Sequence, residues 1–237
     1  MASAISWAFE QNEQLIILED DCLPDPSFFN YCQTLLERYA DHEEVMMISG
    51  NNFQPSRRTD ASYYFSRYTH IWGWATWKSA WQHFDLDGVS WPQVKREKKL
   101  RQVFSDPQEY AHWTKTLDSQ FAGNIDTWDF PWAYAVWSRN GVAILPERNL
   151  VTNIGFGADA THTLDPESKL ADIPAGDIGA LLHPIDVAVN AAADRYTWKS
   201  VFRPTAQTPS APREPYWKKL NLFRRRRKQR QEEVDVA

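Results

Sequence analysis

Three short apolar runs constrain the fold of this 237-residue chain more than any other feature. They read "LIIL" at 15–18, "VMMISG" at 45–50 and "VAILP" at 142–146, and apolar and polar residues do not alternate within them. Such runs are typical of strands that are covered on both faces, as in a parallel sheet. Helical patterns alternate with the runs, so the order helix, strand, helix, strand predicts an α/β sheet with crossover connections.

Helical patterns flank the first apolar run. Residues 5–12 are expected to form the last turns of a helix, and Pro26 after Asp25 predicts the start of the next helix, with Asp25 as its N-cap. Apolar residues then recur every three or four positions, which predicts one buried helix face. That face comprises Phe28, Tyr31, Cys32, Leu35, Leu36 and Tyr39.

Two further helices are predicted later in the chain. In "HIWGWATWKSAWQHF" a glycine-containing loop leads into a helix that carries Trp77, Trp81 and Phe84. Another helix is expected from 126 to about 139, where an "NG" turn follows. The stretch "NLVTNIGFGADATHT" predicts a strand and a loop, and the regular patterns end near residue 164.

Composition indicates a globular protein, because 43% hydrophobic and 24% charged residues are ordinary proportions for that class. Twelve tryptophans exceed the number that a core of this size needs. The surplus aromatic side chains are expected either to line a site for sugars or bases or simply to fill the core.

The two cysteines and the absence of apolar segments of 18 residues predict a cytoplasmic protein. Cys22 and Cys32 fit no zinc-site spacing, and the apolar context of Cys32 predicts a reduced, buried thiol without a disulfide between the two. The first residues lack the basic start and apolar run of a secretion signal. No segment approaches the length of a membrane span.

Three consecutive acids, Glu19, Asp20 and Asp21, follow the first apolar run directly. Ligands of α/β sheets gather at the carboxyl ends of strands. Neighbouring carboxylates repel one another there unless a cation compensates, and Mg²⁺ or Mn²⁺ prefers one or two carboxylates together with diphosphate oxygens. The alternative is that Glu19 and Asp20 are solvated while Asp21 and Asp25 cap the next helix.

The segment "ILEDDCLPDPSFF" resembles the acidic motif of GT-A-fold glycosyltransferases. The most similar group is the bacterial nucleotide-diphospho-sugar transferases, also called HlpA-like hemolytic proteins. The resemblance extends through "MMISGNNF", "FSRYTHIWGWATWKSAW", "DTWDFPWAYAVWSRNGVAILP" and "NLVTNIGFGADATHT", and thus covers roughly residues 5–163. It implies a GT-A fold, an α/β architecture with a Rossmann-like mixed sheet.

The same resemblance implies a metal-dependent glycosyltransferase. Such an enzyme transfers a sugar from a UDP- or GDP-linked donor to a saccharide or lipid-linked acceptor in cell-surface polysaccharide synthesis. Asp21 would bind Mn²⁺ or Mg²⁺, while Glu19 and Asp20 would contact the ribose or metal-bound water. His162 would be a second metal ligand and favours manganese; the alternative is a hydrogen-bonding loop residue.

An inverting transferase also needs a base that takes the proton of the acceptor hydroxyl. The segment "DTWDFPW" offers Asp126 and Asp129, and the resemblance favours Asp129. Its apolar flanks are expected to raise the pKa of such a carboxylate. The alternative is a capping arrangement in which Asp126 is the N-cap and Asp129 lies three residues further on.

Two polar or aromatic clusters are candidate sugar-binding residues. Trp72, Gly73 and Trp74 are expected to form an acceptor platform, with core packing as the alternative. Asn51 and Asn52 would hydrogen-bond sugar hydroxyls or else form the turn after the second run.

The sequence also predicts how the chain divides into regions. The GT-A-like core is expected at 1–164, an extension at 165–202, a Pro-rich linker at 203–216 and a basic tail at 217–237. The strand, helix and "NRP"-like loop that precede the acidic motif in the family are missing, so the fold is expected to be N-terminally incomplete, with an open sheet edge. The tail either contacts an anionic membrane on its inner face or stays solvated, and no nucleic acid is expected.

Two other functions are compatible with these features. One is a catalytically inactive carbohydrate-binding or scaffold protein derived from such an enzyme, which the missing N-terminal segment favours. The other is a metal-dependent phosphoester or pyrophosphate hydrolase, in which the acids and His162 would bind a cation for attack by water.

Overall fold

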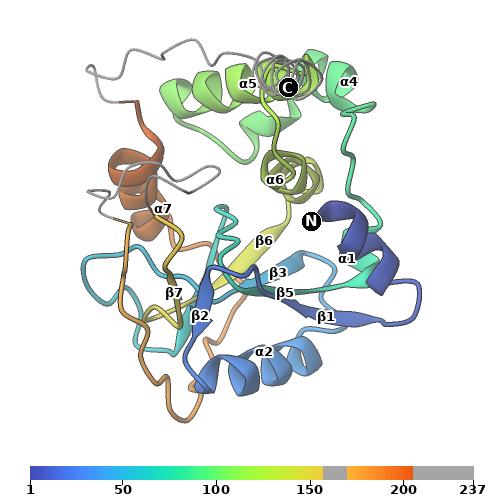
Figure 1. The fold of residues 1–237 in the computed structure, drawn as a ribbon. Coiled ribbons are helices and arrows are strands. Elements are labelled where there is room, and N and C mark those ends of the chain that lie inside the picture. Colours follow the sequence, from blue (N-terminus) through green and yellow to red (C-terminus); the bar gives the residue numbers. More distant parts are fainter. Residues whose placement is uncertain (157–169, 205–237) are drawn as a thin grey trace, which may run out of the picture. The chain divides into compact units, whose positions relative to one another are not determined.

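A five-stranded mixed sheet lies at the centre of the described part of the chain, residues 1–156 and 170–204, in a computed structural model (Figure 1). The strand order is β1-β5-β3-β6-β4. The strands are β1 (Gln14–Ile17), β3 (Val45–Ser49), β4 (Tyr63–Ser66), β5 (Trp74–Trp77) and β6 (Val142–Pro146). Among them only β3 and β6 pair in parallel. The chain is therefore a mixed α/β protein.

The first apolar run forms a strand where predicted, but its expected surroundings are wrong. Strand β1 lies at the edge of the sheet, pairs antiparallel with β5, and buries only Ile17 fully. A four-residue aliphatic run can be covered by a helix on one face while one strand edge stays open, and the sequence pattern is the same in both cases. The runs that form β3 and β6 are buried throughout, as predicted.

A second, two-stranded sheet joins distant parts of the chain. Strand β2 (Cys22–Pro24) pairs antiparallel with β7 (Val151–Asn153), with Cys22 opposite Asn153. Backbone hydrogen bonds extend this pairing at both ends, from Ile154 N to Asp21 O at 2.9 Å and from Asp25 N to Leu150 O at 2.8 Å. The acidic triplet is thereby fixed beside the segment that follows β7.

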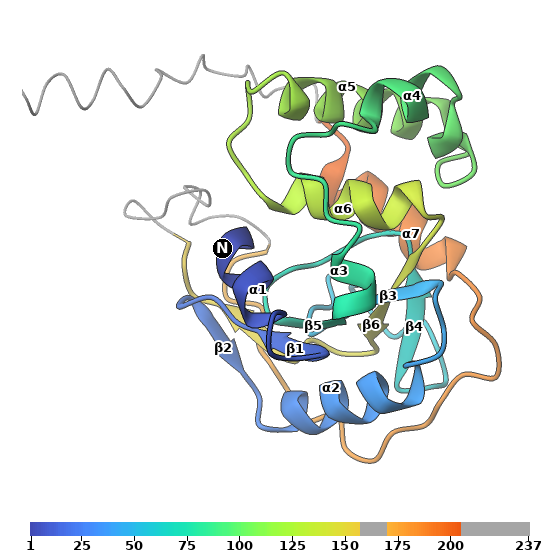
Figure 2. The ribbon, with the colours of Figure 1, turned by 90° about the vertical axis from the view of Figure 1, so that its right-hand side faces the viewer.

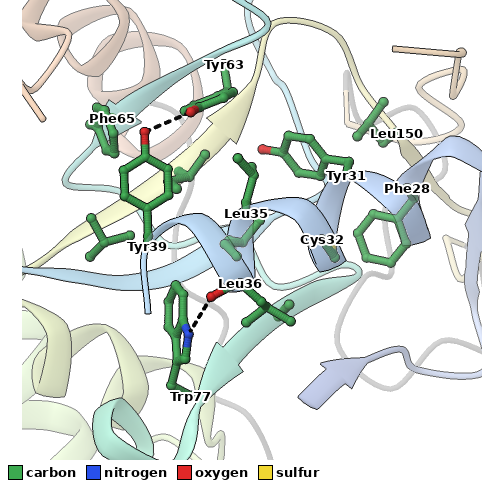
Figure 3. Packing of buried hydrophobic residues seen from close by; sticks show 14 of the residues in the cluster. Phe28, Tyr31, Cys32, Leu35, Leu36, Tyr39, Tyr63, Phe65, Trp77 and Leu150 are labelled. Carbon is green, nitrogen blue, oxygen red and sulfur yellow. Dashed lines mark hydrogen bonds between the residues drawn. The ribbon is translucent and has the colours of Figure 1, made fainter. Parts of the chain in front are cut away.

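Helix α2 (Ser27–Arg38) covers one face of the five-stranded sheet, and its predicted apolar residues are all buried (Figure 3). The indole of Trp77 donates a hydrogen bond to Leu36 O at 3.1 Å, which ties the helix to β5. The carboxylate of Asp25 accepts hydrogen bonds from the backbone N and the hydroxyl of Ser27. This acceptor role at the helix start agrees with the capping prediction, although Pro26 occupies the N-cap position.

Three helices lie over the opposite face of the sheet (Figure 2). They are α1 (Ala2–Ala8), α3 (Lys78–Trp81) and α6 (Asp129–Ser138). The predicted helix through Trp77, Trp81 and Phe84 is correct only at Trp81, because Trp77 ends strand β5 and α3 stops before Phe84. Tryptophan and threonine fit a pleated strand well, and pairing with strands on both sides outweighs the helical spacing.

A layer of helices beyond α6 was not predicted. It contains α4 (Trp91–Arg96), the 3₁₀ turn η1 (Lys99–Arg101), α5 (Pro107–Phe121), α7 (Ala191–Thr197) and the π-helical turn η2 (Trp198–Phe202). The aromatic side chains of α4, α5 and η2 form a core with those of α6. Asp106 caps α5 by accepting hydrogen bonds from the backbone N–H groups of Gln108 and Glu109.

Residues 1–203 form one unit and 204–237 a second. Within the first, Val189 forms a β-bridge with Phe65 of β4, so the segment before α7 lies on the edge of the sheet. Both cysteines are free thiols. Helices of the described residues are all too short or too polar to cross a membrane. The predicted linker and basic tail lie almost entirely outside the described residues.

Candidate functional site

The acidic triplet occupies the connection between β1 and β2, where the chain leaves the main sheet for the small one. Glu19 and Asp21 are half-buried, whereas Asp20 is exposed and makes no side-chain hydrogen bond to the described residues. The three acids therefore do not share one environment. Glu19 and Asp21 face the protein, and Asp20 faces solvent.

Asp21 is held by the residues around the end of β7. Its Oδ2 atom lies 3.4 Å from Nδ2 of Asn153, and its Oδ1 atom lies 3.5 Å from the Cys22 thiol. Burial raises the pKa of Cys22 to about 12, so this thiol is neutral and donates to the carboxylate. A Cβ atom at Gly155 would lie 2.2 Å from Oδ2 of Asp21. Glycine at 155 thus leaves the room that the Asp21 carboxylate occupies.

Glu19 is the acid of the triplet that lies near the start of helix α6. Burial raises its pKa, and the negative charge of Asp21 raises it further. The α-amino group of Met1 and the indole of Trp128 lower the pKa of Glu19, while the charge of Asp129 adds a smaller increase. Trp74, which pairs with Ile17 at the end of β1, stacks on Trp128 next to Asp129, so Glu19, Asp21 and Asp129 lie in one corner of the protein.

Asp129 occupies the first turn of α6. Its Oδ1 atom accepts hydrogen bonds from the hydroxyl of Thr127 and, at 2.9 Å, from the backbone N–H of Phe130. The alternative in which Asp126 caps the helix is wrong: Asp126 is exposed, and the N-cap position belongs to Trp128, which forms no side-chain cap. The helix simply begins three residues later than the sequence pattern indicated, which leaves Asp126 in the preceding loop.

Only part of the predicted aromatic platform lies at this corner. Trp72 is half-buried and its ring lies 5.4 Å from that of Phe156, the residue after Gly155. Gly73 has φ +77°, and a Cβ atom there would lie 2.7 Å from Cγ2 of Val151. Glycine at 73 therefore permits both the turn into β5 and the close contact with β7.

Trp74 is a core residue, so its predicted role in a platform is wrong. Its side chain is fully buried, stacks on Trp128 at 5.8 Å and contacts Trp132 of α6. A position in β5, with β1 on one side and β3 on the other, encloses it. Trp74 still supports the site indirectly, because it backs the tryptophan that contacts Glu19.

Asn51 and Asn52 lie in the irregular segment after β3, and their side chains hydrogen-bond the chain itself. The Asn51 side chain is fully buried: Nδ2 donates to Val151 O at 3.2 Å, and Oδ1 accepts from Trp72 N at 3.0 Å. Nδ2 of Asn52 donates to Pro146 O at 2.9 Å. Because these groups bind the chain itself, the two asparagines fix the position of Trp72 rather than offer their amides to a sugar.

The remaining predicted metal ligand, His162, lies outside the described residues. Within residues 1–156 and 170–204, no three His, Cys, Asp or Glu side chains gather into a group that would hold a metal ion by themselves. Two half-buried carboxylates at one corner fit a hard divalent ion that takes its other ligands from a diphosphate. They do not fit a closed cage made of protein ligands alone.

Four residues of the corner were not predicted: Thr127, Trp128, Asn153 and Gly155. Trp128, Asn153 and Gly155 contact Glu19 or Asp21 across long stretches of sequence. Thr127 contacts Asp129, only two residues away, and this spacing was a local signal, since a hydroxyl two residues before a carboxylate can reach it.

No protein-family model matches the chain, and a search of curated proteins found no match.

Proposed function

We propose that the chain is a metal-dependent, inverting glycosyltransferase with a GT-A-like fold, acting on a UDP- or GDP-linked sugar. One arrangement carries the proposal: Trp74 of β5 pairs with Ile17, two residues before Glu19, and stacks on Trp128, the residue before Asp129. The acidic triplet and the candidate base, far apart in sequence, thus share one corner. Such a corner suits a donor diphosphate and an acceptor hydroxyl side by side.

Asp21 would hold Mn²⁺ or Mg²⁺, and Glu19 would contact the ribose or metal-bound water. Asp21 is restrained by Asn153, and its carboxylate lies in the space that Gly155 leaves open. When bound, the ion would neutralise the charge that develops on the leaving diphosphate. A restrained carboxylate is suited to this role because less conformational freedom is lost on binding.

Asp129 would act as the general base. Two donors occupy its Oδ1 atom, so Oδ2 is the oxygen that would accept a proton from the acceptor hydroxyl. The hydroxyl oxygen would bond to the anomeric carbon of the donor sugar as the bond between that carbon and the diphosphate breaks. The proton stays on Asp129, and the nucleoside diphosphate leaves.

Trp72 would receive the acceptor. Its half-buried ring contacts Phe156 and Phe53, at centroid distances of 5.4 and 5.3 Å, and aromatic faces bind the C–H surfaces of sugars. A saccharide or a lipid-linked saccharide fits this part of the corner. Cytoplasmic action at the inner face of a membrane, aided by the basic residues of 217–237, belongs to the same proposal.

The proposal is tested by measuring nucleoside diphosphate release from UDP-glucose and GDP-mannose by the full chain, with Mn²⁺ or with a chelator. Release is expected to require the metal, and Asp129→Asn is expected to slow it by about 10²-fold or more because the base is lost. Asp87→Asn, at an exposed acid between α3 and α4, serves as the matched control. Equal release by wild type and Asp129→Asn would refute the assignment of the base.

A further inference from the structure

The loop between α5 and α6 is held in place by a buried glutamine. Gln120, in the last turn of α5, is 7% exposed, and its Nε2 atom donates to Thr127 O at 3.0 Å. Its Oε1 atom is buried and has no hydrogen-bond partner among the described residues. Burying an amide oxygen without a partner costs free energy. The hydrogen bond from Nε2 to Thr127 O is the one polar contact of this side chain among the described residues.

The hydroxyl of Thr127 continues this connection to the candidate base. It donates to Oδ1 of Asp129, the same oxygen that accepts from the backbone N–H of Phe130. The second oxygen, Oδ2, has no hydrogen bond to the described residues. A carboxylate held by two donors on one oxygen has a fixed plane, and its free oxygen points in a fixed direction.

We infer that Thr127 is a positioning residue that aims Oδ2 of Asp129 at the acceptor hydroxyl, with Gln120 fixing the backbone of Thr127. This inference rests on the proposed function, because it assigns Asp129 the role of base. Proton transfer depends steeply on geometry, and a misplacement of about 1 Å costs up to about 10²-fold in rate. Thr127 itself takes no proton and touches no substrate.

The alternative is that the same contacts merely start helix α6. Thr127→Val and Thr127→Ser separate the two roles, because valine keeps the shape of threonine without the hydroxyl, whereas serine keeps the hydroxyl. A role limited to helix formation would change stability alone. A positioning role changes the rate in the valine variant and restores it in the serine variant.

Thr127→Val is expected to lower kcat by about 10- to 100-fold. The KM for the sugar nucleotide should stay unchanged. Thr127→Ser should stay within about threefold of wild type. Equal kcat values in wild type and Thr127→Val would overturn the inference.

A crystal structure of Thr127→Val separates this inference from the proposed function. A rotated Asp129 carboxylate supports the positioning role even if no sugar nucleotide is turned over. An Asp129 carboxylate in its original orientation overturns the role even if the chain proves to be a glycosyltransferase. Gln120→Leu, which removes the bond to Thr127 O, is expected to rotate Asp129 in the same direction.

Discussion

At the scale of single residues, glycines determine how closely β7 approaches the acidic corner. Gly73 and Gly155 both occupy places where a Cβ atom would meet a neighbouring side chain, at Val151 and Asp21 respectively. Gly73 also has a positive φ, a region that other L-residues enter at a cost of roughly 1–2 kcal/mol. Two separate penalties are therefore expected at position 73, one from the backbone and one from the contact.

Gly73→Ala is expected to lower the free energy of unfolding by about 3 kcal/mol, because alanine meets both penalties. Gly123→Ala is a matched control, since Gly123 has φ +75° but open space around its Cβ position. It should cost only about 1 kcal/mol, the backbone share. Urea denaturation of both variants measures the difference, and equal losses would show that the contact with Val151 is unimportant.

At the scale of elements, helix α7 is anchored by a half-buried carboxylate. Asp194 accepts hydrogen bonds from the Ser66 hydroxyl at 2.6 Å and from Arg67 N at 3.0 Å. Burial nevertheless raises its pKa to about 6, above the 3.8 of a free carboxyl, and these bonds and the charge of Arg67 only partly oppose the increase. Burial also raises the pKa of Glu109 in α5, and Asp194 adds to that increase.

A raised carboxyl pKa means that the folded state prefers the protonated form. The stability that Asp194 contributes is fully present below about pH 4 and is lost as the pH rises through about 6. Relative to Asp194→Asn, the wild type should therefore gain about 2 kcal/mol in unfolding free energy between pH 7.5 and 4.5. Denaturant titrations at both pH values give this difference. A constant gap between the two proteins would mean that Asp194 is not buried in this way.

Helices and strands with a local sequence signal could be predicted, whereas those that depend on long-range pairing could not. The buried face of α2 was correct because an amphipathic helix repeats within its own sequence. Strand β5 was predicted as a loop that leads into a helix at Trp77, because its pairing with β1 and β3 is long-range. The start of α5 carried a local signal, Asp106 before Pro107, that was overlooked.

At the scale of the whole molecule, the fold brings together residues that lie far apart in the sequence. Their positions along the chain could be predicted, but their proximity could not. The acidic triplet follows β1, as expected, and its neighbour Asp129 lies in the first turn of α6. Their proximity depends on the pairing of β2 with β7 and on the packing of Trp128 against Trp74. None of these contacts leaves a short-range pattern, so the roles of Asn51 and Trp74 could not be decided from sequence.

We propose that a divalent ion and a nucleoside diphosphate bind together at Asp21. Isothermal titration calorimetry of the full chain with UDP and GDP, with and without Mn²⁺, tests this binding. At least one nucleotide is expected to bind only with Mn²⁺. Asp21→Ala is expected to weaken this binding by about 10-fold or more, whereas the exposed control Asp87→Ala should leave it unchanged. Binding that ignores Mn²⁺ or the loss of Asp21, or the absence of binding by either nucleotide, would contradict this proposal.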